Sequence, residues 1–243
     1  MPSLTLSDRL IWFAHCPKAG GTSVEQFMVA RWGAAVGHLH WGWDLWWRDG
    51  GWRVADPPNS PQHLIWRDAA DALPRPPDAV FALVRDPANR IASEYRWQGS
   101  GRRGTRLGKA LARLPFSIWL RLMLAVAARN PHAFDNHLRP QSDFVPDTAC
   151  VFRLEDGLDP VLDWLAEETG ETPKETMGHA IATARPTRIG PKEAGRIAEA
   201  FAADYTRFGY VPMAPPPGTV DLMDGLARGL APCLAWLERR GRL

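Results

Sequence analysis

The sequence predicts an α/β protein with three layers, in which a mostly parallel central sheet is flanked by helices. Two apolar runs of strand length, at 10–14 and 79–84, are each followed by a turn and by the start of a helix. Such alternation of strands and helices is typical of parallel sheets covered by helices. With 243 residues, 45% of them hydrophobic, the chain is long enough to bury one such core.

The first strand, 10–14, leads into a loop containing proline and glycine and then into a helix. Thr22 is a suitable helix cap, and Glu25, three residues later, completes the pattern of a capping box. The stretch 37–61 is rich in Trp, Gly and Pro, so we expect an irregular excursion there, with a short strand at 52–55.

A short helix is predicted at 67–73, ahead of the second strand, 79–84. After that strand, Asp86 is a suitable N-cap and Pro87 fits the first position of a helix. The sequence therefore places a second strand-to-helix junction here.

The second half of the chain continues the alternation. Residues 107–129 are expected to be helical with a break at Pro115, and 150–153 forms a third strand. Helices follow at 160–168 and 191–208, the latter amphipathic.

A proline-rich linker, MAPPPG, begins at Met213 and separates a main domain, 1–212, from a C-terminal segment, 213–243. Leucines at helical intervals predict a helix over 221–240. This helix is expected to pack on its own domain or on a second subunit, in which case it forms a homodimer.

Composition excludes several classes of function. A net charge of +2 does not indicate nucleic-acid binding, and the three cysteines are too far apart for zinc-ligand spacing or a disulfide framework. The N-terminus lacks the pattern of a secretion signal, and no apolar run is long enough to span a membrane. We therefore expect a cytoplasmic protein with no membrane partner.

The loop after the first strand has the composition of a phosphate or sulfate site. Free backbone N–H groups at a helix start favour an anion, and a lysine adds positive charge. A Walker A loop is excluded, because that pattern, GxxxxGK[ST], places the lysine after the glycines. The candidate anion-binding residues are Lys18, Ala19, Gly20, Gly21, Thr22 and Ser23.

A second anion site is predicted after the strand at 79–84, in VRDPANRIASEY. Arg85 offers a planar guanidinium suited to phosphate, and the hydroxyl of Ser93 lies two turns into the following helix. Arg90 shares a face with Ser93 and is either a further phosphate contact or a structural ion-pair partner. An arginine between the strand and Asp86 opposes magnesium binding, so no metal is expected.

Together these motifs resemble those of sulfotransferases that use 3′-phosphoadenosine 5′-phosphosulfate (PAPS). PKAGGTS is similar to the 5′-phosphosulfate loop, PKxGGTS, and VRDPANRIASEY to the 3′-phosphate signature, RDPxxRxxSxY. FDNHLRPQSDF, 134–144, is similar to the family's HxxPQ stretch, whereas an asparagine-containing pattern is missing around 184–189. The resemblance covers about Ile11 to Tyr210.

The resemblance implies a P-loop-like fold and transfer of the sulfuryl group of PAPS to a hydroxyl of a carbohydrate or other small acceptor, leaving the product PAP. Lys18 then neutralises charge on the leaving nucleotide, and Arg85 and Ser93 hold the 3′-phosphate. His63 occupies a segment that carries the catalytic base in the heparan-type 2-O branch of the family. His15 is placed to orient the loop, and His40 is the next candidate base.

Two alternatives to this function stay open from the sequence. One is a homologue that binds nucleotide or carbohydrate without turnover, and the other is a P-loop phosphotransferase, opposed by the lysine order and by the missing Walker B. The role of the tryptophans at 41–52 is also open, since they either stack on sugar rings or pack an irregular loop.

Overall fold

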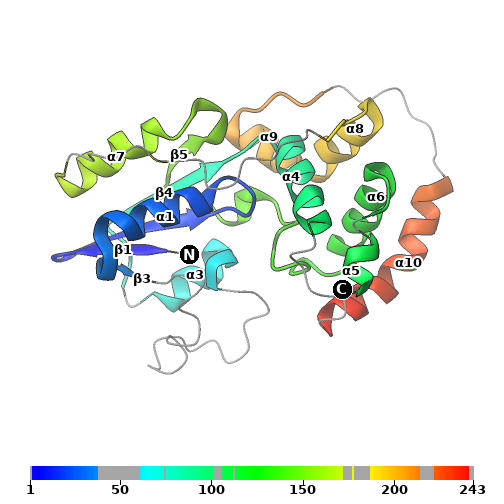
Figure 1. Cartoon of the computed structure of the whole chain (residues 1–243), viewed down its shortest axis with the longest axis horizontal. Helices are drawn as coiled ribbons and strands as arrows, with labels where there is room; N and C mark the ends of the chain where they lie inside the picture. The colour runs from blue at the N-terminus through cyan, green and yellow to red at the C-terminus, as the bar shows by residue number, and fades with distance from the viewer. Residues whose placement is uncertain are drawn as a thin grey trace. The chain divides into compact units, whose positions relative to one another are not determined.

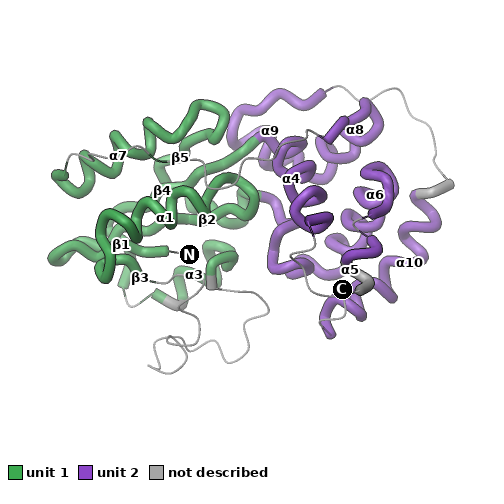
Figure 2. Tube along the Cα trace, in the orientation of Figure 1, with its two compact units in different colours: residues 1–85, 141–182 green, residues 86–140, 183–243 purple. Residues whose placement is uncertain are grey.

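A computed structural model of the whole chain is shown in Figure 1. It describes residues 2–37, 61–73, 75–100, 106–111, 113–171, 177, 187–213 and 222–240. The Trp-rich segment, the strand expected at 52–55 and the histidines at 38 and 40 lie outside these residues. The chain divides into two compact units (Figure 2): unit 1 comprises 1–85 and 141–182, and unit 2 comprises 86–140 and 183–243.

Unit 1 contains a five-stranded mixed sheet with the strand order β3-β1-β2-β4-β5. The α/β class is thus confirmed, and the central strands β2, β4 and β5 are parallel as predicted. The antiparallel part was not anticipated: β1 pairs with both β2 and β3. The five strands are β1 Ser3–Leu6, β2 Arg9–His15, β3 Val36–Gly37, β4 Ala79–Val84 and β5 Cys150–Arg153.

Helices cover both faces of the sheet in unit 1. Because side chains alternate along a strand, Ile11 and Phe13 face one side of β2 and Trp12 faces the other. Ile11 and Phe13 share a core with α1 (Gly21–Trp32) and α7 (Asp159–Thr169). On the opposite face, Trp12 packs against Trp66, the first residue of α3 (Trp66–Ala72), with ring centroids 5.9 Å apart.

The parallel pairing of β2 with β4 brings the two predicted anion-binding motifs to one edge of the sheet. His15, the last residue of β2, is in register with Leu83 near the end of β4. The loop 16–20, which contains Lys18 and is called the lysine loop below, follows His15, and Arg85 follows β4 directly. Both therefore leave the sheet at the carboxyl ends of neighbouring strands, where open α/β sheets bind their ligands.

Unit 2 is helical, and most of its helices begin and end where the sequence predicts. The break at Pro115 is confirmed, whereas the helix expected over 191–208 is interrupted at Phe201, whose backbone leaves the helical region (φ −119°, ψ 30°). None of the helices in the described part of the chain is long and apolar enough to cross a membrane. The helices of unit 2 are α4 Pro87–Gly99, α5 Arg106–Leu111, α6 Phe116–Ala127, α8 Pro191–Ala200, α9 Ala202–Phe208 and α10 Leu222–Arg239.

The predicted C-terminal helix is α10, which packs along α6 within unit 2. Its buried side is made of small residues at helical spacing, Ala227, Ala231 and Ala235, which allow a close approach. Leu226 and Leu230 are exposed on another side of the helix. A homodimer through this helix stays a prediction.

Candidate functional site

The lysine loop is a tight connection between β2 and α1. Lys18 and Gly20 both have left-handed backbones, with φ of 66° and 92°, and the N–H of Ala19 donates to the carbonyl of Cys16 (3.3 Å). Ala19 is buried, whereas Lys18 is partly exposed. A left-handed conformation is rare for a lysine and is typical of functional turns, so the loop holds Lys18 in a specific, less common geometry.

The start of α1 is suited to an anion. Gly20 is the N-cap and offers no side-chain acceptor to the N–H groups of the first turn, and that turn contains no acidic residue. Thr22 is partly exposed and Ser23 is buried in the same turn. These N–H groups, together with the helix dipole, favour a negatively charged ligand.

The predicted capping box is wrong. The helix begins at Gly21, so Thr22 lies inside it and does not cap it. Glu25 does not reach back to the helix start either, because its carboxylate is buried and bound to His15. The cap position instead needs the positive φ of Gly20, which glycine adopts without strain.

His15 lies directly beneath the loop and explains why residue 21 is a glycine. A Cβ at Gly21 would stand only 2.3 Å from Nε2 of His15, so the imidazole fills the space a side chain would need. The ring stacks on Phe13 with centroids 5.5 Å apart. The sequence expectation that His15 orients the loop is consistent with this contact, which joins its ring to the first residue of α1.

Arg85 is held at the end of β4 by Gln141. The backbone N–H of Arg85 donates to Oε1 of Gln141 (2.9 Å), and Nε2 of Gln141 donates to the carbonyl of Arg85 (2.8 Å). Gln141 is fully buried. Its side-chain amide pairs with both backbone groups of Arg85, as the backbone of a neighbouring strand would. Its role was not recognised from sequence, although the residue falls within the HxxPQ stretch.

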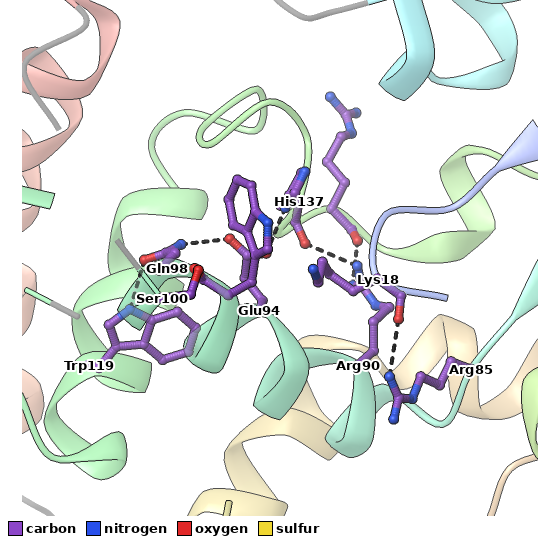
Figure 3. Close-up of polar contacts among 10 residues, drawn as sticks. Lys18, Arg85, Arg90, Glu94, Gln98, Ser100, Trp119 and His137 are labelled. Carbon is purple, nitrogen blue, oxygen red and sulfur yellow. Dashed lines mark hydrogen bonds and ion pairs between the residues drawn. The ribbon is translucent and has the colours of Figure 1, made fainter. Parts of the chain in front are cut away.

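The side chain of Arg85 meets the lysine loop. Its Nη1 donates to the backbone carbonyl of Lys18 at 3.4 Å (Figure 3). Unit 1 therefore brings together Lys18 and Arg85, which the sequence assigned to two separate phosphate groups. This contact of the Arg85 guanidinium with the backbone of the loop that contains Lys18 is the main geometric feature of the candidate site.

His63, the predicted base, belongs to a short helical turn, η3 (Pro61–His63), and is largely buried. Its ring stands edge-on to that of His15, with centroids 5.2 Å apart and an interplanar angle of 81°. Unit 1 thus places His63 beside the residue that supports the lysine loop.

Ser93 stands on α4 in unit 2 and is partly exposed. The start of this helix is as predicted: Asp86 is the N-cap, its carboxylate accepts from the N–H of Asn89 (2.8 Å), and Pro87 follows. The structure brings Lys18 and Arg85 together in unit 1, while Ser93 belongs to unit 2.

Arg90 has a structural role in unit 2. It is fully buried, and its guanidinium donates to the backbone carbonyls of His137 (3.0 Å) and Arg139 (2.7 Å) (Figure 3). Of the two interpretations that the sequence left open for Arg90, these contacts with two backbone carbonyls favour the structural one.

In unit 2, His137 is held by a buried acid, a contact that the sequence did not indicate. Nδ1 of His137 donates to Oε2 of Glu94 (2.6 Å), and Gln98 donates to the other oxygen (2.7 Å). Trp119 completes the chain by donating to Gln98 (3.0 Å), as Figure 3 shows. Glu94 and Gln98 are one turn apart on α4, but nothing in that spacing reveals partners that lie far along the chain.

Comparison of the chain with protein-family models, with curated proteins and with solved structures finds no match.

Proposed function

We propose that this chain is a PAPS-dependent sulfotransferase with a P-loop-like fold, which transfers a sulfuryl group to a hydroxyl of a carbohydrate or other small acceptor. The observation that carries the proposal is the contact between the Arg85 guanidinium and the Lys18 loop at the carboxyl edge of β2 and β4. PAPS carries anionic groups on the 5′ and 3′ sides of one ribose, so it requires two neighbouring cationic sites. Lys18 and Arg85 are proposed to supply these two sites.

The residues of unit 1 fit such a donor. The uncapped start of α1 and the Lys18 ammonium supply donors for the 5′-phosphosulfate. The planar guanidinium of Arg85 matches a phosphate, and two hydrogen bonds with Gln141 hold the backbone of Arg85 in place. Ser93 is the proposed second contact for the 3′-phosphate, carried over from the resemblance.

The chemistry proposed for these residues is a single in-line displacement. The acceptor oxygen forms a bond to sulfur while the bond from sulfur to the 5′-phosphate oxygen breaks, so the SO₃ group changes carriers and PAP leaves. His63 takes the proton of the acceptor hydroxyl, and Lys18 neutralises the charge that develops on the leaving phosphate. The proposal needs no metal, because both cationic groups come from the chain.

Calorimetry with PAP, ADP and ATP tests the proposal. We expect PAP to bind more tightly than ADP or ATP, and Arg85→Ala to weaken PAP binding about 10- to 100-fold, the effect of one charge-assisted hydrogen-bonding group. Arg75→Ala is the matched control, since Arg75 is another arginine of unit 1 and pairs with Asp78 away from the loop. Lys18→Ala should abolish PAP release from PAPS in the presence of acceptor while leaving the fold intact.

Each other outcome has a distinct meaning. Equal affinity for PAP and ADP would remove the 3′-phosphate site and with it the proposal. Tighter binding of ATP with magnesium, followed by its hydrolysis, would indicate a phosphotransferase. Tight binding of PAP without release of PAP from PAPS across a panel of acceptors would indicate a homologue that binds nucleotide without turnover.

A further inference from the structure

A buried polar network joins three segments of unit 1 beneath the lysine loop. His15 at the end of β2 donates from Nδ1 to Oε1 of Glu25 on α1 (2.7 Å). Gln62 of η3 donates from Nε2 to both carboxylate oxygens of Glu25, at 2.9 Å each. All three side chains are at least nine-tenths buried.

The network connects parts of the chain that are distant in sequence. Gln62 is 37 residues from Glu25, so its hydrogen bonds tie η3 to α1, and the shared carboxylate of Glu25 links them to His15 at the end of β2. Water does not compete well for such buried bonds, and a satisfied buried network rigidifies the groups that it joins. The turn that contains Gln62 is therefore fixed relative to the lysine loop.

The same turn carries the proposed base. His63 follows Gln62 directly, and its ring packs edge-on against that of His15. The His15 ring in turn occupies the space that a side chain at Gly21 would need. A short path of contacts leads from His63 through His15 to the first residue of α1. Any movement of η3 would move His63 away from the loop that is proposed to hold the sulfuryl donor.

We infer that Gln62 is a positioning residue, which holds His63 beside the lysine loop by binding the carboxylate of Glu25. This inference rests on the proposed function, because it assigns to Gln62 the placement of the base in that reaction. Gln62 itself need not touch acceptor or donor. A base must lie within hydrogen-bonding reach of the proton that it removes, and small displacements reduce the rate strongly.

Electrostatics explains why the link uses an amide. The pKa of Glu25 is below its ordinary value of 4.5: burial, the largest single influence, raises it, the charge and hydrogen bond of His15 lower it, and the hydrogen bond of Gln62 adds a smaller lowering effect. Glu25 is therefore a carboxylate near neutral pH and requires donors on both sides. The Gln62 amide supplies donors without adding a second negative charge.

The test compares Gln62→Met with Gln98→Met. Methionine has a similar length and no donor, and Gln98 is a matched control, because it is another buried glutamine that donates to a buried glutamate, Glu94 in unit 2. Hydrogen exchange of the amides at 62–65 should become about tenfold faster or more in Gln62→Met and stay unchanged in Gln98→Met. Turnover should fall about 10- to 100-fold in Gln62→Met with PAP affinity retained.

A charge exchange separates positioning from general destabilisation. Gln62→Glu sets two carboxylates against each other and should lower turnover further. The double variant Glu25→Gln with Gln62→Glu restores an amide next to a carboxylate, and the amide on α1 still offers an oxygen to His15. We expect the double variant to recover about tenfold of the turnover lost in Gln62→Glu, as expected for coupled neighbours.

The outcomes distinguish this inference from the proposed function. A wild-type protein that neither binds PAP nor releases it from PAPS refutes the proposed function. If wild type is active, then unchanged exchange at 62–65 in Gln62→Met, unchanged turnover, or loss of PAP affinity in parallel with turnover each overturns the role of Gln62 alone. Failure of the double variant to recover turnover does the same.

Discussion

Gly21→Ala is a direct test of the packing beneath the lysine loop. Residue 21 is the first of α1, and its backbone φ is not in the left-handed region, so alanine is compatible with the backbone. The new methyl group, however, would stand 2.3, 2.4 and 2.7 Å from three ring atoms of His15. Contacts below 3.0 Å require something to shift, and the His15 ring is held by Glu25 and by Phe13.

Two effects of opposite sign set the magnitude of this change. Alanine is favoured over glycine inside a helix by up to about 1 kcal/mol, and less at a first position. Forcing an extra methyl group into a packed interior costs about 1–3 kcal/mol. We therefore expect Gly21→Ala to lower the free energy of unfolding by about 1–2 kcal/mol, since overpacking exceeds the gain in helix propensity.

Urea denaturation measures the effect, with Gly229→Ala as the matched control. Gly229 lies within α10, and a Cβ there would meet nothing within 4 Å, so this variant should be stabilised by about 0.5–1 kcal/mol. In a His15→Ala background the clash disappears, and Gly21→Ala should become neutral or stabilising. An equal cost of Gly21→Ala in both backgrounds would refute the claim that His15 fills the space above Gly21.

Three further outcomes are expected. Glu238→Ala should lower the free energy of unfolding by about 1–3 kcal/mol, measured in urea, because the Phe134 N–H and the Asn130 amide lose their shared acceptor; an unchanged stability would contradict this. Tyr205 should stay protonated until the pH nears 12 in an ultraviolet titration, since burial, followed by the charge of Asp86, raises its pKa to about 12. Its folded-state pKa lies above the ordinary value of 10, so its contribution to stability is complete below pH 10 and is lost as the pH rises through about 12. Gln141→Leu should weaken PAP binding about tenfold in calorimetry, because Arg85 loses both backbone hydrogen bonds to that side chain, and an unchanged affinity would show that the lock is unnecessary.

Local patterns in the sequence were sufficient for most elements of the fold. The strand at 79–84 is a continuous apolar run, and the Asp86-Pro87 pair determines the start of α4 through a side-chain cap and a fixed φ, both of which are local effects. The hairpin of β1 with β2 was missed because its turn contains Ser7 in a left-handed conformation rather than a recognisable Asn-Gly or Asp-Gly pair. Because β1 pairs antiparallel with β2 and β3, the sheet is mixed rather than fully parallel.

The candidate site was only half predictable. The residues proposed to touch ligand stand in short motifs, and the sequence identifies Lys18 and Arg85 directly. Gln141 holds Arg85, and Gln62 holds the turn of His63 through Glu25; these two contacts span sequence separations of 56 and 37 residues. No local propensity reveals such contacts, because they depend on which strands become neighbours. The capping-box error has the same origin, since a distant histidine competes for Glu25.

Contacts within unit 1 therefore constrain the loop between β2 and α1. His15 requires glycine at 21, Glu25 requires donors from both His15 and Gln62, and Gln62 thereby fixes the turn that carries His63. A substitution at Gly21 would push the His15 ring, and that displacement would reach His63 through their edge-on contact. The shape of the loop and the position of His63, the proposed base, are thus linked through direct contacts, so a change that loosens one should displace the other even if binding of the proposed donor is retained.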